Sequence, residues 1–292
     1  MQPDDIVRVT LRGLTHDADE GLEQLLAAGD DDATAAAVFL QILSCRFDDA
    51  LDSADCLSGR KDRLAVAASG MARAVGAGLV GDMPDTAPDD GPYAVLTSML
   101  ELETAMSGGQ IAIADAIATR IGADVTPTTI DQIWACVALV RARGFSGRFT
   151  EADELLARIE TAPVLIDLPQ LVLLVRGSRI FVDGHLGRTE AVEAGMAWLA
   201  DSYPETVKPD YVYAGAYVLA AFGANALGKL PEAAALMLHG GGGPNLPRLQ
   251  VVDRVYGFEM LVEEALARQD SATALTWSEK AETLPISTHH MA

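Results

Sequence analysis

A phrase that returns about every 40 residues constrains the fold of this chain more than any other feature. Its clearest copies are GRFTEADELLARIE from Gly147, LGRTEAVEAGMAWLA from Leu186 and GKLPEAAALMLHG from Gly228. Each copy has a small or polar turn residue, an alanine five positions later and then an amphipathic helix. This period, with a helix on each side of the turn, predicts helical hairpins that stack as a solenoid.

Weaker copies of the phrase extend the array in both directions, from Cys45, Gly109 and Gln269. The anchor alanines of the six copies are Ala50, Ala114, Ala152, Ala191, Ala233 and Ala274. The last four intervals between them are 38, 39, 42 and 41 residues, but the first is 64 residues. We therefore expect an extra helix or a degenerate unit inside the first interval.

The predicted fold is all-α: a tetratricopeptide-like helical-hairpin solenoid, wound as a right-handed superhelix of about 14 helices. Abundant alanine and only 5% aromatic residues suit close helix packing better than strands. We expect one helical-repeat domain over 1–292, with a candidate subdomain boundary in the proline-rich stretch 81–92. The predicted helices are 17–28, 32–44, 48–57, 61–80, 93–106, 110–121, 128–144, 149–159, 168–183, 188–200, 210–226, 231–239, 248–267 and 271–282.

A glycine run in HGGGGPNLP, residues 239–247, raises the question of a phosphate-binding loop. Such a loop needs Gly-Lys-Ser/Thr at the start of a helix that follows a strand. This chain has no Gly-Lys-Ser/Thr, and a predicted helix precedes the glycines. The run is therefore interpreted as a connector between two hairpins.

Other chemical motifs are missing from the sequence. The five histidines have no zinc-binding spacing, the three cysteines form no close pair, and no Gly-x-Ser-x-Gly elbow occurs. We therefore predict no catalytic residues, no cofactor, no metal and no enzymatic activity, with an all-α enzyme as a disfavoured alternative. A net charge of −21 argues against direct binding to nucleic acid or anionic lipid. The sequence has no signal-peptide pattern and no membrane-length apolar run, so we expect a cytoplasmic, soluble chain.

A binding groove is the remaining candidate site. In tetratricopeptide hairpins the first helix lines the concave face, and with the turn residue at position 15, positions 2, 5, 9 and 12 face the groove. That register selects Glu103, Trp134, Arg141, Arg176, Phe222, Asn225, Tyr256 and Glu263. Arginines, aromatic rings and an asparagine are typical of peptide or ligand grooves, and the two arginines could hold an acidic partner. The alternative is that the aromatic residues are core and the others are solvated.

The C-terminal stretch 239–284 resembles the helical-repeat region of large LuxR-family transcriptional regulators of actinobacteria. In that group a glycine-rich segment ending in Gly-Pro-x-Leu-Pro joins two helical units, as Gly243 to Pro247 would here. An Ala-Leu-Ala phrase follows at Ala265–Ala267, then a turn and an alanine-rich helix with Trp277. Gln269 stands where the family usually has glycine, which weakens that turn.

The resemblance implies a regulatory segment that binds a protein or small-molecule effector in a concave groove and signals to other modules. The family's ATP-binding and helix-turn-helix modules have no counterpart in these residues, so DNA would be bound only through a domain outside this chain. We expect the gene to extend beyond Ala292, and we expect either a homodimer or an ordered contact at the C-terminal end. The alternative is a free-standing tetratricopeptide-like adaptor that scaffolds other proteins.

Overall fold

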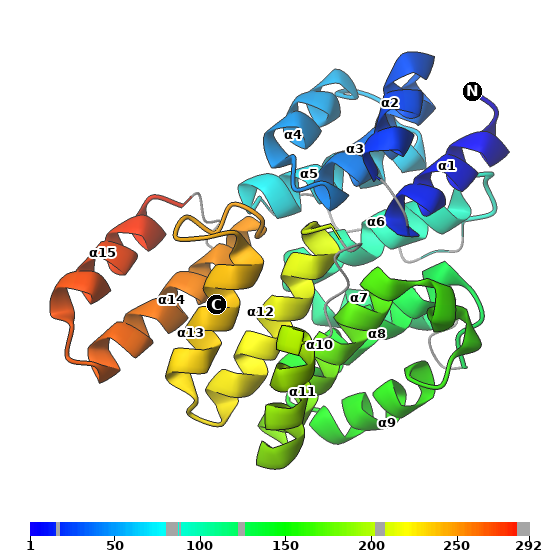
Figure 1. The fold of residues 1–292 in the computed structure, drawn as a ribbon. Coiled ribbons are helices and arrows are strands. Elements are labelled where there is room, and N and C mark those ends of the chain that lie inside the picture. Colours follow the sequence, from blue (N-terminus) through cyan, green and yellow to red (C-terminus); the bar gives the residue numbers. More distant parts are fainter. Residues whose placement is uncertain (16–17, 80–86, 88, 122–125, 202–207, 285–292) are drawn as a thin grey trace. The chain divides into compact units, whose positions relative to one another are not determined.

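The computed structural model describes residues 1–15, 18–79, 87, 89–121, 126–201 and 208–284 (Figure 1). These residues contain fifteen α-helices, one 3-10 turn and no strand, which confirms the all-α prediction. The elements are α1 (Pro3–Thr15), α2 (Ala18–Ala28), α3 (Asp31–Leu43), α4 (Phe47–Cys56), α5 (Arg63–Ala77), α6 (Ala94–Ser107), α7 (Ile111–Ile121), α8 (Ile130–Phe145), α9 (Phe149–Ile159), η1 (Pro163–Asp167), α10 (Pro169–His185), α11 (Thr189–Asp201), α12 (Tyr211–Ala226), α13 (Leu230–Gly241), α14 (Val251–Ala267) and α15 (Ser271–Glu282).

Fourteen of these helices match the predicted ranges to within three residues at each end. The remaining helix, α1, was not predicted, although Ile6, Val9 and Leu14 form a buried helical face on it. The long interval between Ala50 and Ala114 contains one extra helix, α5, between α4 and α6. The array of hairpins is therefore interrupted by α5, within the interval where the long spacing predicted an extra helix.

The chain divides into two compact units, which fall within Met1–Ala142 (unit 1) and Arg143–Pro285 (unit 2). The division lies inside α8. Most of the candidate boundary at 81–92, namely 81–86 and 88, lies outside the described residues.

Six hairpin turns share one backbone conformation. The turn residue has a positive φ in each: Cys45 (57°), Gly109 (69°), Gly147 (74°), Gly187 (73°), Gly228 (71°) and Gln269 (62°). The N–H of the next residue then donates to the carbonyl five residues back, as in Arg148 to Arg143 (2.8 Å) and Asp270 to Ala265 (2.9 Å). This is the Schellman arrangement that closes a helix C-terminus and favours glycine. The recurring phrase therefore encodes one repeated turn.

The turn geometry corrects the register of one copy of the phrase. The positive φ belongs to Gly187, so the residue five positions later is Val192 and not Ala191. Val192 is completely buried, whereas Ala191 is exposed. The equivalent Ala50, Ala114 and Ala152 are also completely buried. The apolar anchor is thus a general feature of the second helix, and in this copy it is a valine.

In unit 2, α10 and α12 are in contact backbone to backbone. A Cβ atom added to Gly184 would lie 2.1 Å from the carbonyl oxygen of Gly223, and one added to Gly223 would lie 2.1 Å from that of Ile180. One added to Gly177 would lie 2.2 Å from the carbonyl oxygen of Ala216. Any side chain at these three glycines would push the two helices apart. Glycine inside these helices is therefore required by packing, despite its low helix propensity.

The glycine run combines a helix end with a tight connector. Gly240 and Gly241 belong to the last turn of α13, so the predicted end at 239 was two residues short. A Cβ at Gly240 would meet the Cβ of Tyr217 at 2.4 Å, so close packing selects glycine there. Gly242 (φ 81°) and Gly243 (φ 109°) then reverse the chain. The connector thus begins at Gly242, so the prediction is right for Gly242 and Gly243 and wrong for Gly240 and Gly241, which are helical.

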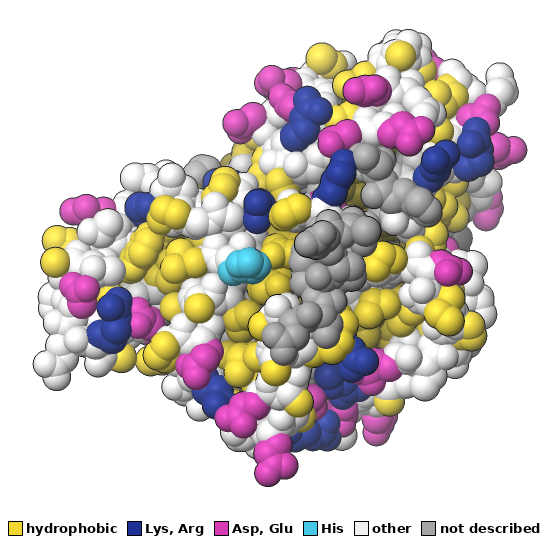
Figure 2. All heavy atoms as spheres, viewed as in Figure 1, with side chains coloured by type: hydrophobic (Ala, Val, Ile, Leu, Met, Phe, Trp, Pro, Cys, Tyr) yellow, Lys and Arg dark blue, Asp and Glu magenta, His cyan; other side chains and the backbone are white. Residues whose placement is uncertain are grey.

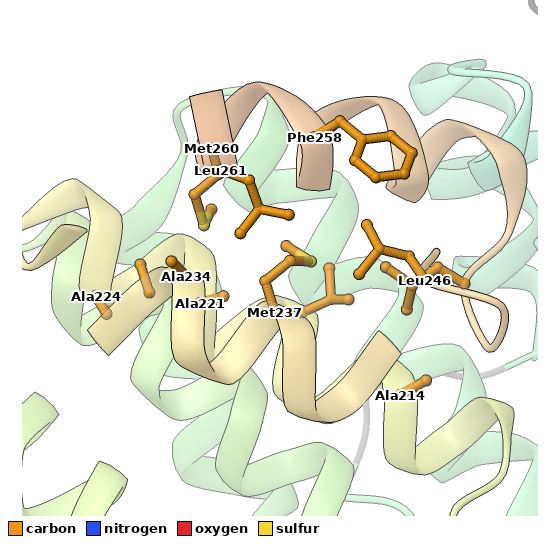
Figure 3. Close-up of a cluster of buried hydrophobic side chains, with 12 residues drawn as sticks. Ala214, Ala221, Ala224, Ala234, Met237, Leu246, Phe258, Met260 and Leu261 are labelled. Atoms are coloured by element: carbon orange, nitrogen blue, oxygen red, sulfur yellow. The ribbon is translucent and has the colours of Figure 1, made fainter. Parts of the chain in front are cut away.

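Beyond the glycines, residues 242–250 form a connector that is held by both neighbouring hairpins. Leu246 enters the hydrophobic cluster of unit 2 beside Met237, Phe258 and Leu261 (Figure 3). The ammonium group of Lys280 donates to the carbonyl of Pro244 and to Asn245 Oδ1, each at 2.7 Å. The most distinctive segment of the sequence is therefore a structural joint.

Candidate functional site

Trp134 and Arg141, the groove candidates of unit 1, lie in its interior. Trp134 is buried and meets Phe39 of α3 edge-on, with ring centroids 5.9 Å apart. Arg141 of α8 donates to Glu103 of α6 at 2.5 Å, and Glu103 is completely buried. A buried carboxylate requires such a partner, because an unpaired charge in the core is very costly. These side chains hold α3, α6 and α8 together.

Arg176 does not occupy a groove position on α10. It was selected from the copy of the phrase whose predicted register is wrong by one residue. With Gly187 as turn residue, the equivalent positions on α10 are occupied by Leu174, Gly177, Phe181 and Gly184. Arg176 instead lies over the ring of Trp198 on α11, 5.6 Å from its centroid. It is exposed, and it packs toward the second helix of its own hairpin.

Phe222 and Tyr256, two groove candidates of unit 2, lie side by side. Their ring centroids are 6.1 Å apart in an edge-to-face arrangement, and Phe145 adds a third ring 6.3 Å from Phe222. Phe145 and Tyr256 are 52% and 44% exposed, and Phe222 is half-buried between them. We call these three residues the aromatic row. Its residues come from three helices that are distant in sequence: Phe145 is the last residue of α8, Phe222 lies on α12 and Tyr256 lies on α14.

The aromatic row has a rigid support. The ring of Phe181 on α10 is buried behind it, 5.5 Å from Phe145 and 6.4 Å from Phe222. Gly144 leaves the space for that ring, since a Cβ there would lie 2.3 Å from Phe181 Cε1. Phe149 also packs edge-on against Phe181, with ring centroids 5.7 Å apart. The exposed rings are therefore held in fixed positions rather than on a loop.

Polar groups border the aromatic row. Asn225 is one helical turn beyond Phe222, and its Oδ1 is buried with no hydrogen-bond donor among the described residues. Glu259 and Glu263 are exposed and follow Tyr256 by three and seven residues, so they share its face of α14. The row is thus apolar at its centre and acidic along α14.

A pocket of about 720 Å³ lies elsewhere in unit 2, between α11 and α13. One face of α13 lines it with Glu232, Ala235, Leu236 and His239. The opposite wall is formed by Met196, Ala197, Leu199 and Ala200 of α11. Hydrophobic side chains gather over these helices beside a histidine in the space-filling view (Figure 2).

Tyr217 of α12 completes the pocket and belongs to a small aromatic cluster. Its ring centroid is 4.8 Å from that of His239 and 4.6 Å from that of Tyr213. The hydroxyl of Tyr213 shares a hydrogen bond of 2.5 Å with His239 Nε2, and Tyr217 donates to the carbonyl of Leu199 at 3.3 Å. Burial raises the pKa of Tyr213 above its ordinary value, so this phenol is neutral at physiological pH.

No group of three or more His, Cys, Asp or Glu side chains in the described part of the chain has a geometry that could hold a metal ion. Of the three cysteines, Cys136 is buried, Cys45 is half-buried at its turn and Cys56 is exposed. Across the same residues, no helix is long and apolar enough to cross a bilayer.

The sequence reasoning missed Phe145 and the whole pocket. Phe145 is one position beyond those assigned to the groove, and an aromatic residue just before a hairpin turn was the available signal. For the pocket there was no such signal, because 232, 235, 236 and 239 show only the ordinary spacing of one helix face. Compared with protein-family models, curated proteins and solved structures, the chain matches none of them.

Proposed function

We propose that this chain is the sensor and partner-binding segment of a cytoplasmic LuxR-type transcription regulator. In this proposal the hairpins stack as a tetratricopeptide-like right-handed solenoid, and DNA is contacted only through a module outside this chain. Two observations support the stacking. The same Schellman turn recurs six times, and position 9 of one hairpin meets position 9 of the next, as in Glu103–Arg141 and Phe181–Phe222.

The observation that carries the proposal is the aromatic row. Large apolar rings at the surface of a protein are costly unless a partner covers them, and rigid aromatic anchors dominate the energetics of interfaces. Phe145 and Tyr256 are about half exposed, yet Phe145 packs on the buried ring of Phe181 and Tyr256 packs on Phe222. A surface with this arrangement is prepared for binding and loses little conformational entropy when a partner arrives.

The charges next to the aromatic row define the partner. Glu259 and Glu263 border the rings, and the chain has a net charge of −21. We therefore infer a protein or peptide segment with an apolar anchor flanked by lysine or arginine. Such a segment would be attracted over long range by the acidic surface and held at short range by the rings.

Two fluorescent peptides test this inference: an aromatic-anchored peptide flanked by lysines, and the same peptide flanked by glutamates. We expect the basic peptide to bind at least about tenfold more tightly, since the charge difference acts beside two carboxylates. Tyr256→Ala should weaken its binding by about tenfold or more. Ile166→Ala is the control, because Ile166 is 87% exposed in the same unit and far in sequence from the row. Equal binding of both peptides, or an unaffected Tyr256→Ala variant, would refute the partner assignment.

The regulatory role is tested separately in cells. Chromatin immunoprecipitation of the full-length gene product should recover promoter DNA, and the Tyr256→Ala variant should change expression from that promoter. A stable protein partner without any promoter association would instead support the free-standing adaptor.

A further inference from the structure

The pocket between α11 and α13 is separate from the aromatic row and calls for a different ligand. We propose that it binds a small lipophilic cation, a compact apolar molecule with one positively charged nitrogen or phosphorus centre. The inference rests on the volume, the walls and the charge of the pocket. It does not depend on the partner proposed for the aromatic row.

The size and walls of the pocket fit a small molecule. A volume of about 720 Å³ lies within the range of ligand sites in proteins. Ala197, Ala200, Ala235 and Leu236 give it smooth, apolar sides, so a ligand must bring an apolar body. The alanines matter in particular, because they leave space between two helices that larger side chains would fill.

The charge of the pocket selects against anions. Among the described residues that line it, Glu232 is the one acidic side chain, and none is a lysine or an arginine. Glu232 forms no ion pair among the described residues: Lys229, three residues earlier, bonds to Glu193 at 2.7 Å and interacts with the Glu232 charge only at longer range. Glu232 lies in the first turn of α13, where the positive end of the helix dipole favours an acidic side chain. An anion would therefore meet an unfavourable potential.

Tyr217 adds an aromatic side chain to the lining of the pocket. The ring is buried in the wall of the pocket and packed against Tyr213 and His239, which fixes its orientation. The face of a tyrosine ring attracts a cation through its quadrupole, and this attraction grows when water is excluded. Glu232 and His239 are seven residues apart on α13, about 10 Å along the helix. The pocket thus has an acidic end and an aromatic end, between which an apolar cation can lie.

The proposal is tested with two ions that have the same size and shape but opposite charge, tetraphenylphosphonium and tetraphenylborate. Isothermal titration calorimetry of the full chain should show one site for tetraphenylphosphonium. Binding of tetraphenylborate should be at least about tenfold weaker, because the two ions differ only in the sign of their charge. Equal affinity for both ions, or tighter binding of tetraphenylborate, would overturn the assignment to cations.

Variants locate the binding site. Glu232→Gln should weaken tetraphenylphosphonium binding about threefold to tenfold, and Glu190→Gln on exposed α11 surface makes the same charge change outside the pocket and should have no effect. Ala235→Trp should abolish binding by filling the pocket, and Ala200→Phe should do so from the opposite wall if the first variant misfolds. Binding that survives both filled pockets would place the ion elsewhere and refute the proposal. Tyr256→Ala should leave this affinity unchanged, so failure here is distinct from failure of the aromatic row.

Discussion

Replacement of Gly223 by alanine is expected to destabilise unit 2, although alanine is the better helix former. The new Cβ would lie 2.1 Å from the carbonyl oxygen of Ile180, 2.6 Å from its carbonyl carbon and 2.9 Å from the Cα of Phe181. An ordinary contact between carbon and oxygen is about 3.3 Å or more, so the methyl group falls about 1.2 Å short. All three neighbours are backbone atoms of α10, which cannot rotate away as a side chain can.

The magnitude follows from two opposing effects. Overpacking a core costs up to about 3 kcal/mol when the surroundings cannot yield, and the upper end applies because α10 and α12 must separate along their length. Alanine regains about 1 kcal/mol through its higher helix propensity. We therefore expect a net loss of about 2 kcal/mol, which corresponds to a fall of roughly 4–8 °C in the melting temperature.

Gly215 in the same helix provides the matched control. A Cβ at Gly215 would meet only Leu174 Cδ1 at 3.6 Å, an ordinary van der Waals distance. Gly215→Ala should therefore stabilise the protein by about 0.5–1 kcal/mol through helix propensity. Thermal and urea unfolding of the full chain, followed by circular dichroism at 222 nm, measures both variants. If Gly223→Ala proves as stable as Gly215→Ala, the close contact between α10 and α12 is not as described.

Three further predictions concern a turn, a buried carboxylate and the connector. Gln269→Gly should raise stability by about 1 kcal/mol in urea unfolding, because Gln269 has a φ of 62°, which glycine adopts more easily than a residue with a side chain. An unchanged or lower unfolding midpoint would contradict the turn geometry. Burial raises the pKa of Asp210 from 3.8 to about 6, so the folded state holds the proton more tightly and stability falls as pH rises from about 4 to about 6. Asp210→Asn should abolish that fall and be about 2–3 kcal/mol more stable than the wild type at pH 7.5, while a parallel pH dependence in both proteins would refute the assignment. Lys280→Met removes two hydrogen bonds to the connector and should cost about 1 kcal/mol in thermal unfolding; the exposed Lys61→Met serves as its control.

Much of the local structure was predictable, because its causes are local. A glycine with a positive φ closes a helix by bonds within six residues, so Gly109, Gly147 and Gly228 mark their turns directly. The same turn forms at Cys45 and Gln269, where the side chain is tolerated because the rest of the hairpin holds the backbone. The pattern also located the extra helix between α4 and α6 by a break in the spacing.

Errors arose where local patterns allow two answers. LGRTEA fits the phrase with the turn at Leu186 or at Gly187, and only the positive φ of Gly187 and the burial of Val192 decide between them. That shift of one residue turned Arg176 into a groove candidate, although it packs on Trp198. A change of one residue rotates a helix position by about 100°, so site assignments suffer most from register errors while helix boundaries hardly change.

By itself, the sequence determined the helices, their turns and the regular spacing of the hairpins, since each depends on interactions between residues close along the chain. Only the tertiary structure decided which side chains meet. Glu103 and Arg141 pair across 38 residues, Phe222 meets Tyr256 across 34, and the pocket lies between helices joined only through α12. These contacts depend on how closely neighbouring hairpins approach, and that distance is set by glycines such as Gly184 and Gly223 acting together across α10 and α12. The local sequence pattern does not specify such a pair of glycines, because each one permits a close approach only when the other helix already lies beside it.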